Sequence, residues 1–365
     1  MITSRLLRTL SAAVCTSLLL ANQVHAKSLK DERVTDGPYI DVHNKALSVN
    51  WICDDQVKHT QLKLEEDSLP YSFNACGLTA ITSQLHFDEQ LIEYQNVKRV
   101  AALSDLHGQY ELMLTLLKNN KIIDKNNRWA FADGHFVITG DIFDRGDKVT
   151  EILWFIHDLE KQAEQAGGKI HLLLGNHEVM VLNGDLRYLH PKYVKAEQLL
   201  ETPFDQLFNQ QTILGRWLRS KPVLVKINDH LYAHGGFHPQ LAEDKVTLGT
   251  INKTFKSHLV EKELPKKREG FARYLHKTHG PIWYRGYFKD DGATAEELDL
   301  LLKHFDVNHI VVGHTSQKKI ETRFNGKVIA IDSSIKKGKY GEVLFIENGK
   351  HERGTLKGKR KPLKR

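Results

Sequence analysis

Cysteine is scarce in this chain. Only three cysteines occur in 365 residues, and Cys15 lies in an apolar N-terminal stretch. The remaining two, Cys53 and Cys76, lie outside every polar motif described below, so neither is assigned a catalytic role. In an oxidising compartment these two can form one disulfide, which would contribute about 3 kcal/mol in the chain-entropy account. Two unpaired, buried thiols are the alternative.

Long hydrophobic runs are also missing. The run over residues 10–21 is too short to cross a bilayer, and no other run approaches the required length. Arg5 and Arg8 precede this run, and a small-x-small sequence ending at Ala26 follows it, as is typical of a secretory signal peptide. A disordered or buried N-terminal helix is the alternative. We therefore expect cleavage after Ala26 and a secreted, periplasmic protein without a transmembrane segment.

The chain has no large excess of charge of one sign. It contains 52 Lys and Arg against 45 Asp and Glu, a formal charge of +7, and loss of residues 1–26 with their two arginines leaves +5. Much of this excess lies in residues 351–365, which we interpret as a basic, solvated and disordered tail. Binding of that tail to an anionic surface or to nucleic acid is the alternative. No nucleic-acid partner is expected, and nothing indicates the oligomeric state.

Neither internal repeats nor low-complexity linkers divide the chain. Residues 27–95 contain short alternating stretches that predict an accessory β-rich segment, and residues 96–350 form the main domain. Residues 184–221 and 238–285 are longer and mixed, and we expect them to cap the site. The main domain begins with alternating strands and helices and ends with strands. The expected strands cover residues 97–103, 135–139, 170–174, 222–227, 231–233, 309–312, 328–331 and 343–346, the last two closing antiparallel, and the expected helices cover residues 110–117 and 150–166.

Five short polar segments follow apolar runs of this domain: SDLHG, GDIFDRG, GNHE, HGG and GHT. The carboxyl ends of strands in an open α/β sheet are where ligands bind, so we expect these segments to converge. A single histidine of this kind would more often be structural, but the joint pattern of carboxylate, amide and imidazole groups suits two ions of Mn, Fe or Zn and disfavours Ca²⁺. The candidate metal ligands are Asp105, His107, Asp141, Asn176, His234 and His314.

Three further residues in these segments predict a phosphoryl-transfer site. Two ions that share Asp141 would hold a bridging hydroxide, which would attack phosphorus directly. Arg145 suits the phosphoryl oxygens, although an ion pair at the start of a helix is an alternative. His177 can protonate the leaving oxygen, and Asp144 can orient its imidazole. A helix N-cap is the alternative for Asp144.

The motifs Asp-Leu-His-Gly-Gln, Gly-Asp-Ile-Phe-Asp-Arg-Gly and Gly-Asn-His-Glu resemble the phosphoprotein phosphatase branch of the calcineurin-like metallophosphoesterase superfamily. The leader and the segment Gly280-Pro281-Ile282-Trp283-Tyr284-Arg285 resemble the Shewanella-like protein phosphatases. The resemblance implies a four-layer α/β/β/α sandwich of two mixed sheets, with residues 96–350 as the catalytic domain. It implies that Asp105, His107 and Asp141 hold one metal ion, and that Asp141, Asn176, His234 and His314 hold the other. It also suggests Arg285 as a substrate contact, with a surface arginine as the alternative.

The chain departs from its relatives at two places. The Ser-Ala-Pro-Asn-Tyr-Cys loop of eukaryotic serine/threonine phosphatases is replaced by residues 330–334, and Ser316 stands where some members carry a second histidine. We therefore expect fewer protein ligands on the first ion and no strict preference for phosphoserine or phosphothreonine. The function that the sequence favours is dephosphorylation of phosphoproteins, with phosphotyrosine preferred. Hydrolysis of dinucleoside polyphosphates or nucleotides is the alternative, followed by a non-catalytic metal-binding envelope module.

Overall fold

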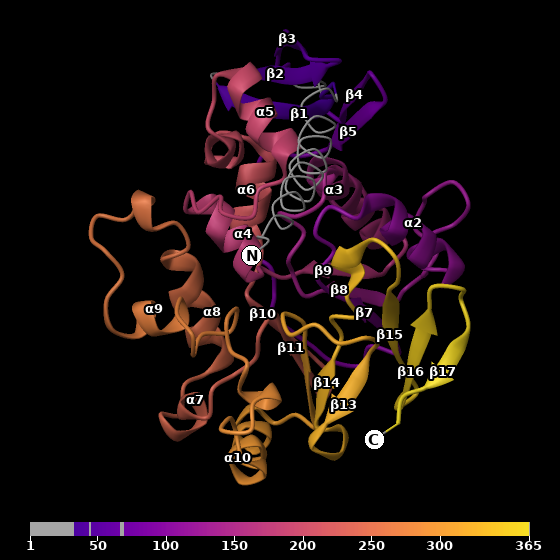
Figure 1. Ribbon diagram of the computed structural model, residues 1–365, viewed down its shortest axis with the longest axis vertical. Helices are drawn as coiled ribbons and strands as arrows, with labels where there is room; N and C mark the ends of the chain where they lie inside the picture. The colour runs from indigo at the N-terminus through magenta and orange to yellow at the C-terminus, as the bar shows by residue number, and fades with distance from the viewer. Residues whose placement is uncertain (1–32, 44, 66–68, 365) are drawn as a thin grey trace, which may run out of the picture.

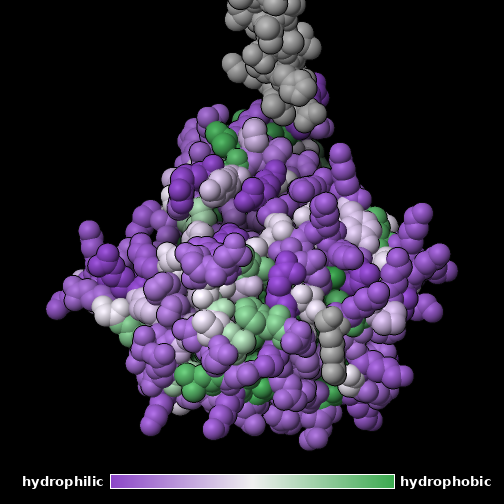
Figure 2. Space-filling model, turned by 60° about the horizontal axis from the view of Figure 1, so that its bottom comes forward, coloured by the Kyte–Doolittle hydropathy of each residue, from purple (hydrophilic) through white to green (hydrophobic). Residues whose placement is uncertain are grey.

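The computed structural model describes residues 33–43, 45–65 and 69–364. The predicted signal peptide, residues 1–26, lies outside them. Within the described ranges, no helix has the length and apolar character needed to span a bilayer. Figure 2 shows a face that is mainly hydrophilic, with hydrophobic side chains in small groups.

Two six-stranded sheets form the centre of the molecule (Figure 1). In the first sheet, three neighbouring strands run parallel and the C-terminal strands continue it as antiparallel neighbours. Its order is β17 (Arg360–Pro362), β16 (Lys350–Thr355), β15 (Glu342–Glu347), β7 (Arg99–Leu103), β8 (His135–Ile138) and β9 (Lys169–Leu172). The strands predicted over residues 97–103, 135–139, 170–174 and 343–346 are therefore confirmed.

The second sheet is also mixed. Its order is β13 (Glu321–Arg323), β14 (Val328–Ala330), β12 (His309–Val312), β11 (His230–Ala233), β10 (Leu224–Ile227) and β6 (Glu93–Tyr94). The strand expected over residues 328–331 exists as β14. The expectation that it is antiparallel is correct for only one of its two neighbours. This strand runs parallel to β12 and antiparallel only to β13, because the chain passes β12, enters the sheet at the edge as β13 and turns back between the two as β14.

The two sheets face each other across an apolar layer. Val100 and Ala102 point into this layer, whereas Ala101 and Leu103 belong to the core on the other side of the sheet. Because both faces are buried, the strands read as continuous apolar runs rather than as alternating ones. Helices cover the outer faces, which completes the expected four-layer sandwich (Figure 1). They include α2 (Tyr110–Asn119) and α3 (Val149–Gln165) on the first sheet, and α8 (Leu248–Ser257) and α10 (Ala295–Phe305) on the second.

The two predicted caps differ in position. The first contains α5 (Pro191–Leu200) and α6 (Ile213–Ser220), which pack mainly against the N-terminal strands, so the expectation that all of residues 184–221 cover the site was wrong. The second contains α7 (Gln240–Glu243) and α9 (Gly270–Leu275), and the loop after α9 borders the site described below. Between the caps and the core, α4 (Asn176–Leu182) begins directly at a candidate ligand.

The N-terminal segment is rich in β-structure, as expected. It forms an antiparallel sheet of β1 (Asp36–His43), β2 (Ala46–Cys53) and β3 (Gln56–Lys63), and a hairpin of β4 (Tyr71–Ala75) and β5 (Leu78–Thr82). A disulfide between Cys53 and Cys76 links sheet and hairpin. The end of the segment is not accessory, because β6 is an edge strand of the second main sheet.

Residues 351–364 of the basic tail are ordered, which corrects the expectation for this part of the chain. Residues 350–362 form β16 and β17 of the first sheet. The Arg360 guanidinium lies over the Phe345 ring and within 3.8 Å of carboxylate oxygens of Glu347 and Glu352. The basic composition of the segment predicted a solvated end. The partners of Arg360 lie on other strands, and the local sequence does not show that they come into contact with it.

Candidate metal centre

The predicted ligands converge at one edge of the two sheets. Asp105 and His107 follow β7, Asp141 follows β8, and Asn176 opens the helix after β9. The second sheet supplies the other two ligands from equivalent positions, since His234 follows β11 and His314 follows β12. All six side chains are at most 5% exposed. Burial of so many ionisable groups is costly unless charges are paired or coordinate a metal.

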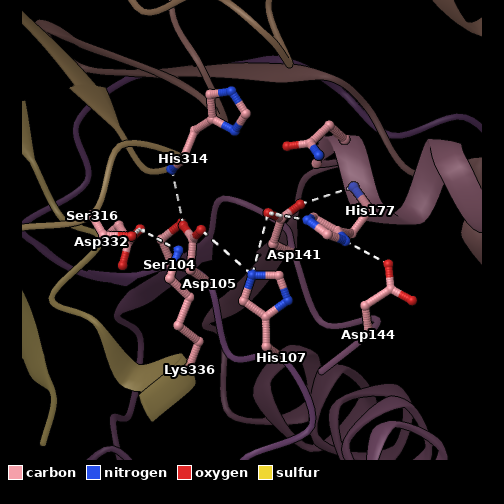
Figure 3. Close-up of polar contacts among 12 residues, drawn as sticks. Ser104, Asp105, His107, Asp141, Asp144, His177, His314, Ser316, Asp332 and Lys336 are labelled. Carbon is pink, nitrogen blue, oxygen red and sulfur yellow. Dashed lines mark hydrogen bonds and ion pairs between the residues drawn. The ribbon is translucent and has the colours of Figure 1, made fainter. Parts of the chain in front are cut away.

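Asp141 occupies the middle of the cluster (Figure 3). Its Oδ2 atom lies 3.6 Å from His107 Nε2 and 3.2 Å from His234 Nε2. On one side, His107 Nε2 is 3.8 Å from Asp105 Oδ1. On the other side, His234 Nε2 is 2.9 Å from Asn176 Oδ1 and 3.1 Å from His314 Nδ1. The ligand atoms thus form two groups that share one carboxylate.

Neighbouring carbonyls fix the imidazoles in the orientation that a metal requires. His107 Nδ1 donates to the Phe143 carbonyl at 2.7 Å, and His234 Nδ1 donates to the Thr139 carbonyl at 2.9 Å. Both Nε2 atoms are thereby directed at Asp141. Among the described residues, the buried His107 Nε2 has no hydrogen-bond partner. This arrangement is the usual outer support of metal-ligating histidines, so the residues present fit a metal pair.

The electrostatics of the cluster also fit bound cations. Burial, followed by the charges of Asp332 and Asp141, raises the pKa of Asp105 to about 8. Burial lowers the pKa of His107 to about 3 despite Asp141, which keeps that imidazole neutral. For His234, burial opposes the charged form, but Asp141 outweighs it and raises the pKa to about 9. A cation beside Asp141 would stabilise the ionised carboxylates and the neutral imidazoles that metal binding needs.

The backbone at the strand ends is strained. Asp105, His107, Asp141 and His314 all have φ between 44° and 61°, in the left-handed region that non-glycine residues seldom adopt. Such strain persists only where the surrounding structure enforces it, and it concentrates at functional sites. Gly140 shows how tightly these turns pack, because a Cβ added there would lie 2.3 Å from the Gly175 nitrogen.

Glu178 and Asp332 support the cluster, and sequence reasoning assigned neither a role. The buried Glu178 carboxylate accepts hydrogen bonds from the backbone N–H groups of Asp141, Ile142 and Gly175, which ties two motifs together. Its signal in the sequence is its place in the GNHE segment, three residues after Gly175. Asp332 follows β14 at the same edge of the sheets, and that position is the signal that could have identified it.

Ser316 does not turn toward the ligand groups. Its hydroxyl donates to Asp332 Oδ2 at 2.6 Å, while Asp332 Oδ1 accepts from the Ser334 N–H at 2.9 Å (Figure 3). The replacement segment at residues 330–334 and Ser316 therefore form one polar network beside Asp105. The expectation of fewer protein ligands on the first ion stays a prediction.

His177 and Asp144 form a buried pair next to Asp141. His177 Nδ1 lies 2.5 Å from Asp144 Oδ2, and His177 Nε2 lies 3.8 Å from Asp141 Oδ2. Burial disfavours the charged imidazole, but Asp141 and the Asp144 hydrogen bond outweigh it and raise the pKa of His177. The helix-cap alternative for Asp144 is wrong, since α3 begins at Val149 with Lys148 as its N-cap.

The two arginines contact different segments around the centre. Arg145 is exposed, its guanidinium lies 5.2 Å from the Tyr188 ring centroid, and within the described part of the chain it has no ion pair. Arg285 is half-buried, and its Nη1 donates to the His314 carbonyl at 2.9 Å and to Thr315 Oγ1 at 3.1 Å. No carboxylate of the described residues forms a hydrogen bond with either arginine, so both can contact an anionic ligand.

A cleft of about 670 Å³ adjoins the centre through Trp283 and Arg285, although none of the six candidate ligands lines it. Trp283 and Arg285 form its inner wall, with the Trp283 ring 5.7 Å from the His314 ring. Its lining carries charges of both signs, with the basic residues Arg187, Lys277 and Lys289 and the acidic residues Asp185, Asp291 and Glu297. Arg187 is paired with Asp185 at 2.8 Å. Trp283 and Tyr284 both line the cleft, and Trp283 is the more exposed of the two, whereas Tyr287 is a buried core residue.

Comparison with known proteins agrees with the fold and the centre. The calcineurin-like phosphoesterase family matches residues 98–318, which contain all six candidate ligands. The chain therefore belongs to this family of metallophosphoesterases, whose members use a dinuclear metal centre.

Individual relatives narrow the comparison. Shewanella-like protein phosphatase 2 of Arabidopsis thaliana is 38% identical, over 67% of this chain and 73% of its own length. Shewanella-like protein phosphatase 1 of Plasmodium berghei is 27% identical, over 67% and 69%. The solved structure of a cold-active protein-tyrosine phosphatase from a psychrophilic Shewanella is 44% identical with a TM-score of 0.84, and the match covers 90% of this chain and 99% of that one.

Proposed function

We propose that the chain is a metal-dependent phosphoprotein phosphatase that acts on phosphotyrosine. The observation that carries this proposal is the convergence of two ligand groups sharing Asp141, an acid pair and two arginines at one edge of the sandwich. The similarity to a protein-tyrosine phosphatase over almost its whole length supports the substrate class.

Each ligand group would hold one ion. Asp105, His107 and Asp141 form the first group, and Asp141, Asn176, His234 and His314 form the second. The donor set suits Mn, Fe or Zn. When bound, the two ions would activate water as the nucleophile and neutralise charge on the phosphoryl group.

His177 is the proposed general acid. Spacing alone would also admit it as a ligand, since its Nε2 lies near Asp141 Oδ2. The hydrogen bond from its Nδ1 to the buried Asp144 stabilises the protonated imidazole, which can then give its Nε2 proton to the leaving oxygen. Asp144 thus acts through His177 as a positioning residue.

Arg145 and Arg285 are the proposed phosphate contacts. Guanidinium groups match the geometry of phosphoryl oxygens and remain charged at all relevant pH values. Arg285 is positioned by the carbonyl of a candidate ligand, His314, so it enters the site with a defined orientation. Among the described residues, Arg145 is held by its backbone and by the Tyr188 ring, so it retains more freedom.

The cleft would accept the peptide that flanks the phosphorylated residue. Its lining offers the Trp283 ring for the phenyl group, and its charged side chains of both signs can contact polar flanking residues. A phenol leaves with a pKa near 10, so a tyrosine ester depends less on His177 than a serine ester does.

The proposed location of the enzyme is the periplasm. The sequence of residues 1–26 supports export, and the Cys53–Cys76 disulfide suits an oxidising compartment.

A substrate panel on the mature protein loaded with Mn, Fe or Zn tests the activity. We expect the highest kcat/KM on phosphotyrosine peptides, a lower value on matched phosphoserine peptides, and little hydrolysis of diadenosine tetraphosphate. Preference for the dinucleotide would replace the proposal with nucleotide hydrolysis. Absence of hydrolysis of every substrate, p-nitrophenyl phosphate included, with metal bound would favour the non-catalytic module.

A further inference from the structure

A second histidine cluster lies at the opposite ends of two strands that carry catalytic ligands. His230 is the first residue of β11 and His309 is the first residue of β12, and the parallel register pairs them directly. The third member, His351, lies near the start of β16 in the other sheet. The cluster therefore draws on both sheets.

The strand register places all three side chains between the sheets. His230 lies two residues before Tyr232, and His309 two residues before Val311, and both of these point into the inter-sheet layer. His351 pairs with Ile346, which points into the same layer. Because side chains alternate along a strand, the backbone alone directs the three imidazoles toward one another.

The imidazoles meet at distances suited to a shared ion. One nitrogen from each ring lies within 4.8 Å of the others. His230 Nε2 and His351 Nε2 are 2.7 Å apart, and the ring centroids of His230 and His309 are 4.5 Å apart. Modest ring rotations would bring three nitrogens to about 2.0–2.1 Å from a central zinc ion.

Two of the rings are supported in the manner of metal ligands. His230 Nδ1 lies 2.8 Å from Asp229 Oδ1, and Asp229 Oδ2 in turn accepts from Asn308 Nδ2 at 2.8 Å. His309 Nδ1 donates to the Gly326 carbonyl at 2.9 Å. With both Nδ1 atoms engaged, the Nε2 atoms of His230 and His309 are the coordinating atoms, as in carboxylate–histidine–metal arrangements.

We propose that His230, His309 and His351 form a separate binding site for a late first-row divalent ion, with zinc as the expected occupant. Three neutral imidazoles favour Zn²⁺, Cu²⁺ or Ni²⁺ over Mg²⁺ and Ca²⁺. His230 is buried, whereas His309 and His351 are partly exposed, so a water molecule can complete the coordination from the solvent side. Direct hydrogen bonding between imidazoles without a metal is the competing explanation.

The site is distinct from the phosphatase centre. His230 and His234 are separated by four residues of strand, or about 13 Å at about 3.3 Å per residue. The ion would join β16 of the first sheet to β11 and β12 of the second. Its role would therefore be to hold the two sheets together, and its loss should lower stability while leaving the chemistry at the other end intact.

Zinc content of the purified full chain, measured after removal of loosely bound metal, tests the proposal. We expect His351→Asn and His309→Asn to each lose one zinc per chain, to retain turnover of p-nitrophenyl phosphate, and to melt at a lower temperature. His86→Asn, at an exposed position, is the matched control and should lose no zinc. Equal zinc content in the unmodified chain and both variants would overturn the proposal.

A second background separates this site from the catalytic one. In Asp141→Asn, which removes the shared catalytic carboxylate, a tightly bound zinc should remain and should disappear in the double variant with His351→Asn. Cobalt substitution of the Asp141→Asn chain should give the intense visible absorption of a tetrahedral site, absent from the double variant. If cobalt absorption and zinc content do not differ between these two proteins, the histidines bind no metal. This comparison needs no phosphatase activity, so it stands or falls independently of the proposed function.

Discussion

Asp144 Oδ2 accepts a hydrogen bond from His177 Nδ1 at 2.5 Å, and both residues are buried beside the shared carboxylate Asp141. The pair couples an imidazole facing the reaction site to a carboxylate that solvent does not reach. The orienting carboxylate favours the protonated ring that a general acid needs. The same pairing also supports metal-ligating histidines, so the metal content of a His177 variant separates the two roles.

Replacing His177 with Asn should lower kcat by about 10²–10⁴-fold for phenyl phosphates with poor leaving groups, the usual contribution of a general acid. The loss should shrink for p-nitrophenyl phosphate, whose leaving oxygen needs no proton. Steady-state kinetics over a series of substituted phenyl phosphates measures this, alongside metal content. His86→Asn is the control. Metal loss in proportion to the activity loss would identify His177 as a ligand instead.

Arg285→Lys should weaken binding of the phosphoryl group. A hydrogen bond to a charged group contributes about 1.5–3 kcal/mol, so the inhibition constant for inorganic phosphate should rise by about 10–100-fold. Arg273→Lys, at an exposed position of α9, should leave that constant unchanged. If phosphate inhibits the Arg285→Lys variant as strongly as the unmodified enzyme, Arg285 only positions the loop at His314.

Removing the disulfide should destabilise the N-terminal segment without affecting catalysis. The bond closes a loop with a sequence separation of 23 residues, which corresponds to about 3 kcal/mol of unfolding free energy. The double variant Cys53→Ser and Cys76→Ser should show this loss in denaturant unfolding, with kcat/KM unchanged. Adding a reductant to the unmodified protein should reproduce most of the effect. A reductant-insensitive unfolding curve would contradict a stabilising disulfide.

His157 should make stability depend on pH. Burial, with a smaller contribution from Lys221, lowers the pKa of this histidine to about 3, against about 6.5 in an unfolded chain. Between these values the unfolded state binds one more proton than the folded state, so stability falls as the pH drops, by up to about 1.4 kcal/mol per unit. Above about pH 6.5 the imidazole is neutral in both the folded and the unfolded state, so His157 no longer makes the stability depend on pH.

His157→Phe, which suits the surrounding rings of Trp154, Phe87 and Trp217, should flatten that dependence by about one proton. Denaturant unfolding at several pH values between about 6.5 and 4 measures the slope. An identical slope in the variant would show that His157 does not titrate on unfolding, whereas the exposed His86→Phe control should keep the original slope.

Much of the centre could be predicted from the sequence, for a physical reason. Ligands such as Asp105, Asp141 and His314 directly follow apolar strands, and the glycines beside them mark the tight turns. Local patterns therefore placed each ligand at a strand end. Because the strand ends meet at one edge of the sheets, the ligands were predicted to lie close together. The helix at Val149–Gln165 was predictable for the same reason, since its apolar spacing and terminal glycines are local signals.

The remainder depends on contacts between distant segments. Glu178 acts on the backbone of Asp141 and Ile142, whose N–H groups carry no signature in the sequence. Asp332 lies beside Asp105 only because β14 runs parallel to β12, a direction that an apolar stretch of three residues does not specify. The C-terminal strands were missed because their basic residues resemble a solvated tail until their partners on β15 are known.

The C-terminal hairpin has a practical consequence for handling the protein. Deleting residues 350–362 would strip β15 of its outer neighbour and leave a row of unsatisfied backbone donors and acceptors, the kind of open edge that recruits other chains into aggregates. Truncated versions should therefore precipitate during expression. Affinity tags and fusion partners belong beyond the last strand on a flexible spacer rather than in place of it.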